Sequence, residues 1–150
     1  METINLNAIL DREDLINDFK SKITNFEQNK DSLNIKRGFY IYGNAGSGKS
    51  MLINNILKEL NYDIINYNAS DVRNKSIIET ITKHNMSDKN IMNLFYKKSK
   101  KIAIVMDEID GMNSGDKGGI NSLIKLMRPK KTRRQKKEDI TLNPIICIGN

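Results

Sequence analysis

Residues 43–50 constrain the fold of this chain more than any other segment, because Gly43-Asn44-Ala45-Gly46-Ser47-Gly48-Lys49-Ser50 matches G-x-x-x-x-G-K-[ST] without a mismatch. An apolar run at 38–42 precedes the motif, and residues 51–60 follow it with apolar side chains at helical spacing. A glycine-rich loop between a strand and a helix turns its backbone N–H groups toward phosphate oxygens, at the positive end of the helix dipole. The sequence therefore predicts a nucleotide phosphate site rather than a simple glycine-rich turn.

Two side chains of the motif carry specific chemistry. Lys49 supplies a positive charge for the β and γ phosphates, and Ser50 offers a hydroxyl ligand for Mg2+. The predicted cofactor contacts from this segment are Gly43, Asn44, Ala45, Gly46, Ser47, Gly48, Lys49, Ser50 and Met51.

Composition narrows the class of protein. The chain has 150 residues, which is the size of one domain with a real core. Lys and Arg total 25 against 18 acidic residues, and the net charge of +7 either favours a polyanionic partner or is ordinary solubilising charge. The single cysteine, Cys147, excludes a disulfide framework and indicates a core residue in a reducing compartment. No apolar stretch approaches the roughly 18 residues of a membrane span, so we expect a soluble, intracellular protein with no membrane partner.

Strand and helix patterns alternate along the chain. A first helix is expected at 11–29, capped by Asp11 with Asp14, and its apolar face comprises Leu15, Ile16, Phe19, Ile23 and Phe26. The expected strands are 38–42, 62–67, 102–106 and 145–148, and the other expected helices are 51–60, 76–83, 89–97 and 120–127. Strands that are apolar on both faces and alternate with helices predict a parallel sheet covered by helices. The predicted fold class is α/β, with the three-layer α/β/α architecture of P-loop NTPases.

Two acidic residues end the apolar run at 102–106. A buried strand would deliver Asp107 to the edge of the sheet, where its carboxylate can hold the metal through water beside Ser50. Glu108 can then orient or deprotonate the attacking water. Alternatively, the strand simply ends in acids before a turn, but the phosphate motif upstream favours the paired interpretation. Asp110 is interpreted as a turn or capping residue.

A polar residue, Asn150, follows the last apolar run. At the tip of a strand beside the strand of the phosphate loop, it can hydrogen-bond the γ phosphate or the attacking water. Asparagine is common in this chain, so position alone leaves chance as an equal alternative.

Together these segments resemble the AAA+ ATPases, and among them the clamp loaders. Residues 68–75, Asn-Ala-Ser-Asp-Val-Arg-Asn-Lys, look like the segment after the second strand of eukaryotic-type clamp loaders. Residues 107–112, followed by Gly-Gly-Ile at 118–120, are similar to a stretch in the large subunit of replication factor C. The resemblance divides the chain into a lead-in helix at 1–36 and an AAA+ nucleotide-binding core at 37–150.

The resemblance implies roles for single residues. Lys49, Ser50, Asp107 and Glu108 take the phosphate, magnesium and water roles described above, and Asn150 takes that of the sensor 1 residue beside the nucleotide. It also implies ATP with Mg2+ as cofactors. Lys49, Glu108 and Asn150 are therefore the expected catalytic residues, and Ser50 and Asp107 the expected metal ligands.

Contacts to DNA and to adenine are implied in the same way. In relatives, basic and polar groups at the start of inner helices follow the template backbone, which points to Arg73, Lys75 and Asn121. A solvated surface charge is the alternative for these residues. The family also uses the lead-in to contact adenine, which points to residues 5–10.

For function, the resemblance implies the ATPase core of a DNA-replication clamp-loader large subunit. Such a protein uses ATP to load a sliding clamp on primed double-stranded DNA, together with other clamp-loader subunits in a hetero-oligomer. It works in the nucleus or at another site of replication, which is the cytoplasm in a viral or prokaryotic setting. The alternatives are another AAA+ remodeller, such as a checkpoint clamp loader, and a nucleotide-gated DNA-binding scaffold without turnover.

Two departures from the family pattern remain. Residues 130–137 carry six charges of one sign where a short connection is expected, so we expect a mobile loop that is either a solvated insertion or a contact to DNA or a partner. The sequence also reaches only the fourth core strand of an AAA+ sheet, whose strand order is 5-1-4-3-2. We therefore expect these 150 residues to lack the fifth strand, lid and sensor 2, to expose the first strand as an edge, and to hydrolyse ATP little or not at all alone.

Overall fold

The computed structural model describes residues 11–68, 101–111 and 117–150. Within these ranges the elements are α2 (Glu13–Asn29), β1 (Gly38–Tyr42), α3 (Lys49–Glu59), β2 (Tyr62–Asn68), β3 (Lys101–Asp107), the 3-10 turn η2 (Ile109–Gly111), α6 (Lys117–Met127), the 3-10 turn η3 (Gln135–Lys137) and β4 (Ile145–Gly149). The helices predicted at 76–83 and 89–97 lie outside the described residues. No helix in the described ranges is long and apolar enough to cross a lipid bilayer.

The four strands form one parallel sheet in the order β1-β4-β3-β2. β1 pairs with β4 from Gly38 opposite Ile145 to Tyr42 opposite Gly149, and β2 pairs with β3 along its whole length. Because all four strands run in one direction, their carboxyl ends meet at one edge of the sheet. This order agrees with the predicted arrangement 1-4-3-2 of the core strands and places the ends of β1, β3 and β4 side by side.

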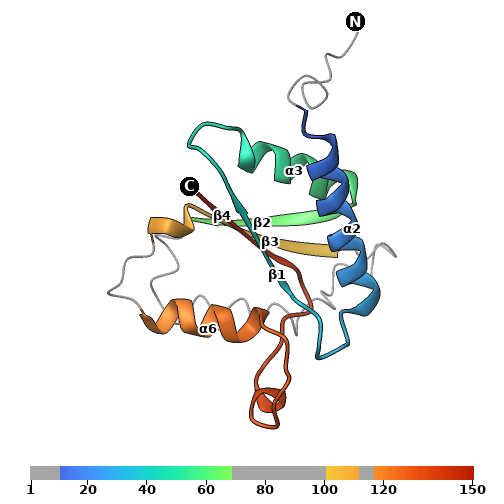
Figure 1. Ribbon diagram of the computed structural model, residues 1–150, viewed down its shortest axis with the longest axis vertical. Helices are drawn as coiled ribbons and strands as arrows, with labels where there is room; N and C mark the ends of the chain where they lie inside the picture. The colour runs from blue at the N-terminus through green and yellow to red at the C-terminus, as the bar shows by residue number, and fades with distance from the viewer. Residues whose placement is uncertain (1–10, 69–100, 112–116) are drawn as a thin grey trace, which may run out of the picture.

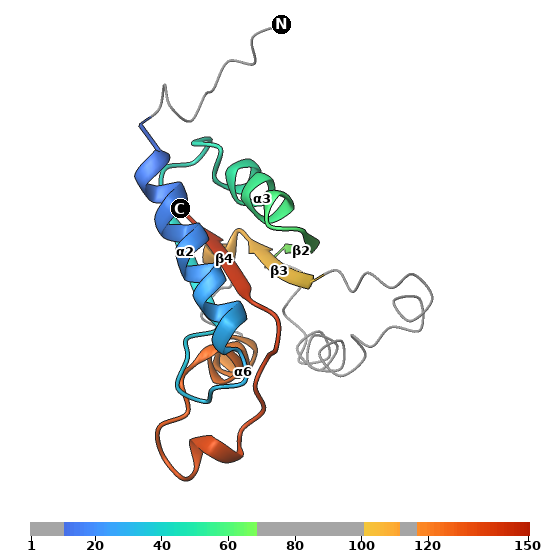
Figure 2. The same cartoon turned by 90° about the vertical axis from the view of Figure 1, so that its right-hand side faces the viewer.

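Helices cover both faces of this sheet (Figures 1 and 2). On β3, Ala103 and Val105 pack in one apolar cluster with the buried faces of α2 and α3. Ile104 and Met106 alternate with them and pack in a second cluster with α6. This alternation builds the three-layer α/β/α architecture that the sequence predicted. Cys147 lies in the second cluster, where burial raises the pKa of its thiol to about 11, as expected of an inert core residue.

The first helix differs from its prediction at the N-terminal end. Four of the five predicted apolar residues are buried, but Leu15 is 55% exposed. The N-cap is Arg12, without a side-chain cap, and Asp11 has a positive φ of 51°, so the predicted Asp11 cap is wrong. Asp14 lies in the first turn, where its charge complements the helix dipole rather than capping the helix.

The rest of α2 is fixed by aromatic packing. The rings of Phe19 and Phe26 meet the ring of Phe39 on β1 edge to face, with centroids 6.0 and 6.5 Å apart. Such edge-to-face pairs add to the free energy of burial. The lead-in helix is therefore part of the core beside β1.

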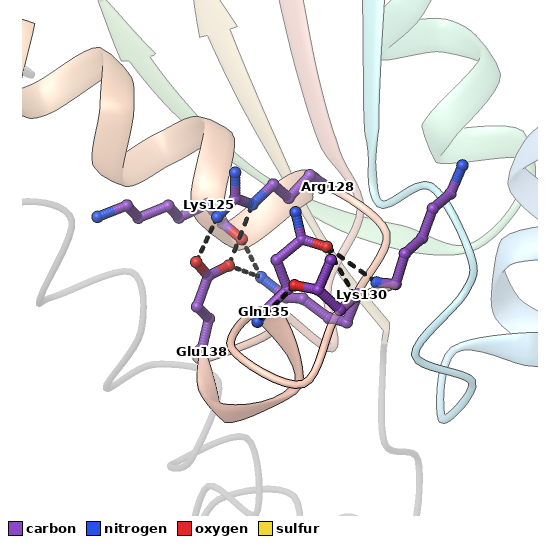
Figure 3. A network of polar contacts seen from close by, with 7 residues as sticks. Lys125, Arg128, Lys130, Gln135 and Glu138 are labelled. Atoms are coloured by element: carbon purple, nitrogen blue, oxygen red, sulfur yellow. Dashed lines mark hydrogen bonds and ion pairs between the residues drawn. The ribbon is translucent and has the colours of Figure 1, made fainter.

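The expectation of a mobile loop at 130–137 is wrong at two points. Lys130 is fully buried, and its ammonium donates hydrogen bonds to the Glu138 carboxylate and the Lys125 carbonyl oxygen (Figure 3). Residues 135–137 form the 3-10 turn η3. The prediction treated all six cations as solvated, whereas Lys130 has a carboxylate partner, Glu138, eight residues further along the chain.

Candidate nucleotide-binding site

The phosphate motif lies between the end of β1 and the start of α3, at the carboxyl edge of the sheet. Gly46 and Gly48 have positive φ angles of 73° and 78°, a conformation that side chains strain, and Gly48 is the N-cap of α3. The first intrahelical bond runs from the Leu52 N–H to the Gly48 carbonyl, so the preceding N–H groups of the first turn have no helical acceptor. This end of α3 can therefore receive an anion.

Lys49 points back over the motif. Its ammonium donates to the carbonyl oxygens of Gly43 at 2.6 Å and Asn44 at 2.8 Å, and to the side-chain oxygen of Asn150 at 3.0 Å. The structure thus brings Lys49 and Asn150 into direct contact although they are 101 positions apart. Both predicted residues lie at one place on the sheet edge.

Ser50 and Asp107, the two predicted metal ligands, also meet. The Ser50 hydroxyl donates to Asp107 Oδ2 at 2.5 Å. A hydroxyl and a carboxylate oxygen suit Mg2+, which keeps several water ligands and needs few from the protein. The described residues contain no group of three or more His, Cys, Asp or Glu side chains placed to hold a metal.

Glu108 follows the end of β3 in a left-handed backbone conformation, with a φ of 55°. Its carboxylate is exposed and accepts a hydrogen bond from the Asn68 side-chain amide at 3.1 Å. Sequence reasoning missed this role of Asn68. The signal was present, because Asn68 ends the strand that pairs with β3 and stands opposite Asp107 in the register.

Asp110 fixes the position of Asn150. One carboxylate oxygen accepts a hydrogen bond from the Asn150 backbone N–H, and the other accepts one from the Tyr40 hydroxyl at 3.3 Å. A Cβ atom on Gly149 would overlap the Tyr40 hydroxyl and lie 2.8 Å from Asp110 Oδ1. The sequence suggested only a turn or capping residue here, whereas Asp110, in η2, binds the end of β4.

Other predicted residues lie apart from this cluster or outside the described ranges. Asn121 is exposed on α6, which covers the opposite face of the sheet from α3. Arg73, Lys75 and residues 5–10 lie outside the described residues. Arg12 was not predicted, yet its guanidinium donates to the Ser47 carbonyl oxygen at 2.7 Å and so ties the start of α2 to the phosphate loop.

Comparison with known proteins agrees with this geometry. The family model described as "ATPase family associated with various cellular activities (AAA)" matches residues 39–150, most of the chain. The chain belongs to the AAA family. Nucleotide binding is the common property of that family, and the AAA match covers every site residue described above except Arg12.

Among AAA proteins, this chain is similar to replication factor C large subunits. It is 34% identical over 110 residues to replication factor C subunit 1 of Saccharomyces cerevisiae, covering 69% of this chain and 13% of that protein. It is 31% identical over 135 residues to the replication factor C large subunit of Methanococcus aeolicus, covering 89% of this chain and 25% of that protein. The resemblance to the large-subunit type is therefore confirmed, and the chain spans a quarter or less of the length of these two relatives.

A solved structure supports the AAA fold alone. The structure of C. elegans PCH-2 superposes with a TM-score of 0.57 at 13% sequence identity, over 91% of this chain and 37% of that one.

Proposed function

We propose that this chain is the ATP-binding and ATP-hydrolysing core of a clamp-loader large subunit, which uses ATP and Mg2+ to place a sliding clamp on primed double-stranded DNA. The observation that carries the proposal is the convergence of Lys49, Ser50, Asp107 and Asn150 at the carboxyl edge of the sheet. Similarity to replication factor C large subunits supports the choice of clamp loading.

The phosphate and metal sites follow from the donor and acceptor groups. The N-terminal turn of α3 and the Lys49 ammonium would hold the phosphates, and Ser50 with Asp107 would hold Mg2+. Bound Mg2+ would neutralise charge that develops on the phosphates during hydrolysis. Lys49 already donates hydrogen bonds to neutral carbonyl oxygens, and a phosphate oxygen would add the attraction between opposite charges.

Glu108 would orient and deprotonate the attacking water. Its carboxylate is exposed at the end of β3, and the Asn68 amide holds it in place. Asn150 would contact the γ phosphate or that water through its side-chain amide. Because Asp110 binds the backbone of Asn150, it positions this amide without entering the chemistry itself.

The proposed partners are the other subunits of a hetero-oligomeric clamp loader, a ring-shaped clamp and primed DNA. The protein would act at the site of DNA replication, which is the nucleus, or the cytoplasm in a viral or prokaryotic setting. Arg73, Lys75 and Asn121 remain proposed contacts to the DNA backbone.

The test separates nucleotide binding from hydrolysis in the assembled complex. Lys49→Ala should weaken binding of a fluorescent ATP analogue roughly 10-fold to 100-fold, as expected when hydrogen bonds to a charged group are removed. Glu108→Gln should bind the analogue normally but lower ATP turnover by roughly 10^2 to 10^4, the usual contribution of a general base. Lys58→Ala is the matched control, because Lys58 is exposed in the last turn of α3, away from the phosphate loop.

Equal nucleotide affinity of the Lys49→Ala and Lys58→Ala complexes would sink the proposed phosphate site. If both Lys49→Ala and Glu108→Gln complexes hydrolysed ATP at the native rate, this subunit would be a nucleotide-gated scaffold rather than a motor. Clamp loading is tested separately, by counting clamps retained on primed circular DNA with native and Glu108→Gln complexes.

A further inference from the structure

The segment between α6 and β4 presents a dense cluster of cations. Five exposed basic residues occupy seven consecutive positions, namely Lys131, Arg133, Arg134, Lys136 and Lys137. Among the residues that the structure describes, none of the five forms an ion pair. The remaining two residues of this basic turn, residues 131–137, are polar, so the turn contains no apolar side chain.

A partly buried network of hydrogen bonds holds the base of the basic turn in place (Figure 3). The Glu138 carboxylate accepts hydrogen bonds from the Lys130 ammonium at 2.9 Å and from the Arg128 guanidinium, whose Nε lies 3.1 Å away. Lys130 is fully buried and also donates to the Lys125 carbonyl at the end of α6, while its backbone N–H binds the Leu33 carbonyl at 2.7 Å. The two ends of the turn are therefore joined to each other and to the body of the protein.

The basic turn has its own internal cap. The Thr132 hydroxyl accepts a hydrogen bond from the Gln135 N–H at 3.2 Å, and the Gln135 side-chain oxygen accepts one from the Thr132 N–H at 3.1 Å. This reciprocal pair is a capping box, the arrangement that starts a helical turn. The Lys136 N–H then binds the Thr132 carbonyl at 3.0 Å, which closes the turn.

This architecture calls for an anion. Like charges held close together repel each other, so a run of basic residues ordinarily stays extended and solvated. Here the capping box and the Lys130–Glu138 ion pair keep five exposed cations together, and a binding partner with several negative charges would relieve their repulsion. The centre of a protein–protein interface is usually formed by apolar and aromatic side chains, and the basic turn has none. This composition favours a nucleic acid over a protein as the partner.

We propose that the basic turn is a binding site for the phosphate backbone of DNA, held in a fixed conformation by the Lys130–Glu138 ion pair. Arg and Lys, helped by polar side chains, make the contacts that position a protein on DNA without reading its sequence. The turn lies beyond the end of α6, at the end of the sheet opposite to the phosphate loop (Figures 1 and 2). This would be a contact remote from the nucleotide site, and it rests on the proposed function only in naming DNA as the polyanion.

The experiment measures binding of the full chain to a fluorescein-labelled primer–template duplex by anisotropy, at several salt concentrations and without nucleotide. The test variant is Arg133→Gln/Arg134→Gln/Lys137→Gln. The control variant, Lys22→Gln/Lys36→Gln/Lys58→Gln, loses the same charge from positions on α2, the loop after it and α3. Thermal unfolding followed by circular dichroism checks that both variants fold.

The basic-turn variant should bind DNA at least roughly 10-fold more weakly than the control at about 0.1 M salt. Its salt slope should also fall by up to about 0.9 for each DNA phosphate that the variant no longer neutralises. The control should behave like native protein within about 2-fold, because it keeps the five clustered cations that would neutralise DNA phosphates. Single-stranded and duplex probes of different sequence should give the same ranking of the variants.

Equal affinity and equal salt slope for the two variants would overturn the proposal. Loss of clamp binding by the basic-turn variant alone, with DNA binding unchanged, would assign the turn to an acidic protein surface instead. The outcome is independent of the proposed ATPase activity, because Lys49→Ala tests that activity and leaves the basic turn intact.

Discussion

The Lys49 ammonium is held by oxygen atoms from two distant parts of the chain, the phosphate loop and Asn150 at the tip of β4. An anion would compete well for this ammonium, because it adds the attraction between opposite charges that the neutral oxygen atoms lack. Nucleotide binding would then release the Asn150 amide for its own contact. At the scale of single residues, the site is therefore a set of exchangeable hydrogen bonds rather than a rigid cage.

Gly149, which precedes Asn150, has no room for a side chain. We predict that Gly149→Ala lowers stability by roughly 1–3 kcal/mol, the usual range for overpacking, and lowers ATP turnover of the assembled complex. The added methyl group would overlap the Tyr40 hydroxyl and crowd Asp110, which binds the Asn150 backbone. Urea unfolding and steady-state turnover measure the two effects.

A double-mutant cycle checks this account. Tyr40→Ala removes two of the three atoms nearest to the added methyl group, so Gly149→Ala should cost less stability in that background than in the native one. An equal loss of stability in both backgrounds would contradict the steric explanation and leave the turnover effect without its proposed cause.

Elements with strong local signals were predictable from the sequence, and contacts between elements were not. The phosphate motif fixed β1 and α3, and the rule that parallel strands end at one edge placed Asp107 beside Ser50. The start of α2 failed because Arg12 binds the phosphate loop across 35 positions, a tertiary contact that no local pattern reveals. Asp110 lies in a turn, as predicted, but its hydrogen bonds to Tyr40 and to the Asn150 backbone were not predicted, because these partners lie on β1 and after β4.

The prediction of a mobile loop after α6 was wrong for a different reason. A charge run was treated as one solvated unit, although Thr132 and Gln135 carry the sequence signature of a capping box. That signature was readable in the sequence. The burial of Lys130 was not, because it depends on Leu33 and Lys125, which belong to other parts of the fold.

At the scale of the segment between α6 and β4, Glu138 is the central residue of the hydrogen-bond network, because it binds both Arg128 and Lys130. We predict that Glu138→Gln lowers the Tm by several degrees and increases protease cleavage within residues 131–137, because the Lys130 ammonium would stay buried without a negative partner. Asp139→Asn is the matched control, since Asp139 is the exposed acidic neighbour and makes no ion pair within the described part of the chain. Limited trypsin digestion and thermal unfolding measure both changes.

The same Tm for the Glu138→Gln and Asp139→Asn variants would show that Lys130 finds other partners. The Lys130–Glu138 ion pair would then not be what holds the basic turn in place. A Lys130→Met/Glu138→Gln variant adds a sharper comparison. Replacing both charges of a buried pair is often close to neutral, so this double variant should recover part of the stability that Glu138→Gln loses.

At the scale of the whole molecule, two charged sites lie at opposite ends of the sheet (Figure 1). The candidate nucleotide site lies where the strands end, and the basic turn lies beyond the opposite end (Figure 1). Two carboxylates link separate elements of the fold: Glu138 binds Lys130 at the base of the basic turn, and Glu27 on α2 accepts a hydrogen bond from the Tyr62 hydroxyl on β2 at 2.8 Å. Hydrogen bonds from these donors favour the ionised form of both carboxylates.

These two carboxylates predict a pH-dependent stability of the whole fold. Hydrogen bonds from Arg128 and Lys130 lower the pKa of Glu138 from 4.5 to about 2. Burial alone would raise the pKa of Glu27, but hydrogen bonds with Lys30 and Tyr62 outweigh it and lower the pKa below 4.5. A lowered pKa in the folded state means that the unfolded chain takes up protons first as the pH falls. This stabilisation is therefore complete above about pH 4.5 and is lost as the pH falls from there toward 2.

We expect the Tm of the native chain to fall across this acidic window and to change little through these groups between pH 6 and 8. The Glu27→Gln/Glu138→Gln variant should start with a lower Tm at neutral pH and show a shallower fall below pH 4.5, because its amides do not titrate. Thermal unfolding from pH 7 to pH 3 gives both curves. Parallel curves for the two proteins would contradict the prediction and would assign acid sensitivity to other carboxylates, whereas convergence of the curves at low pH would tie it to these two links.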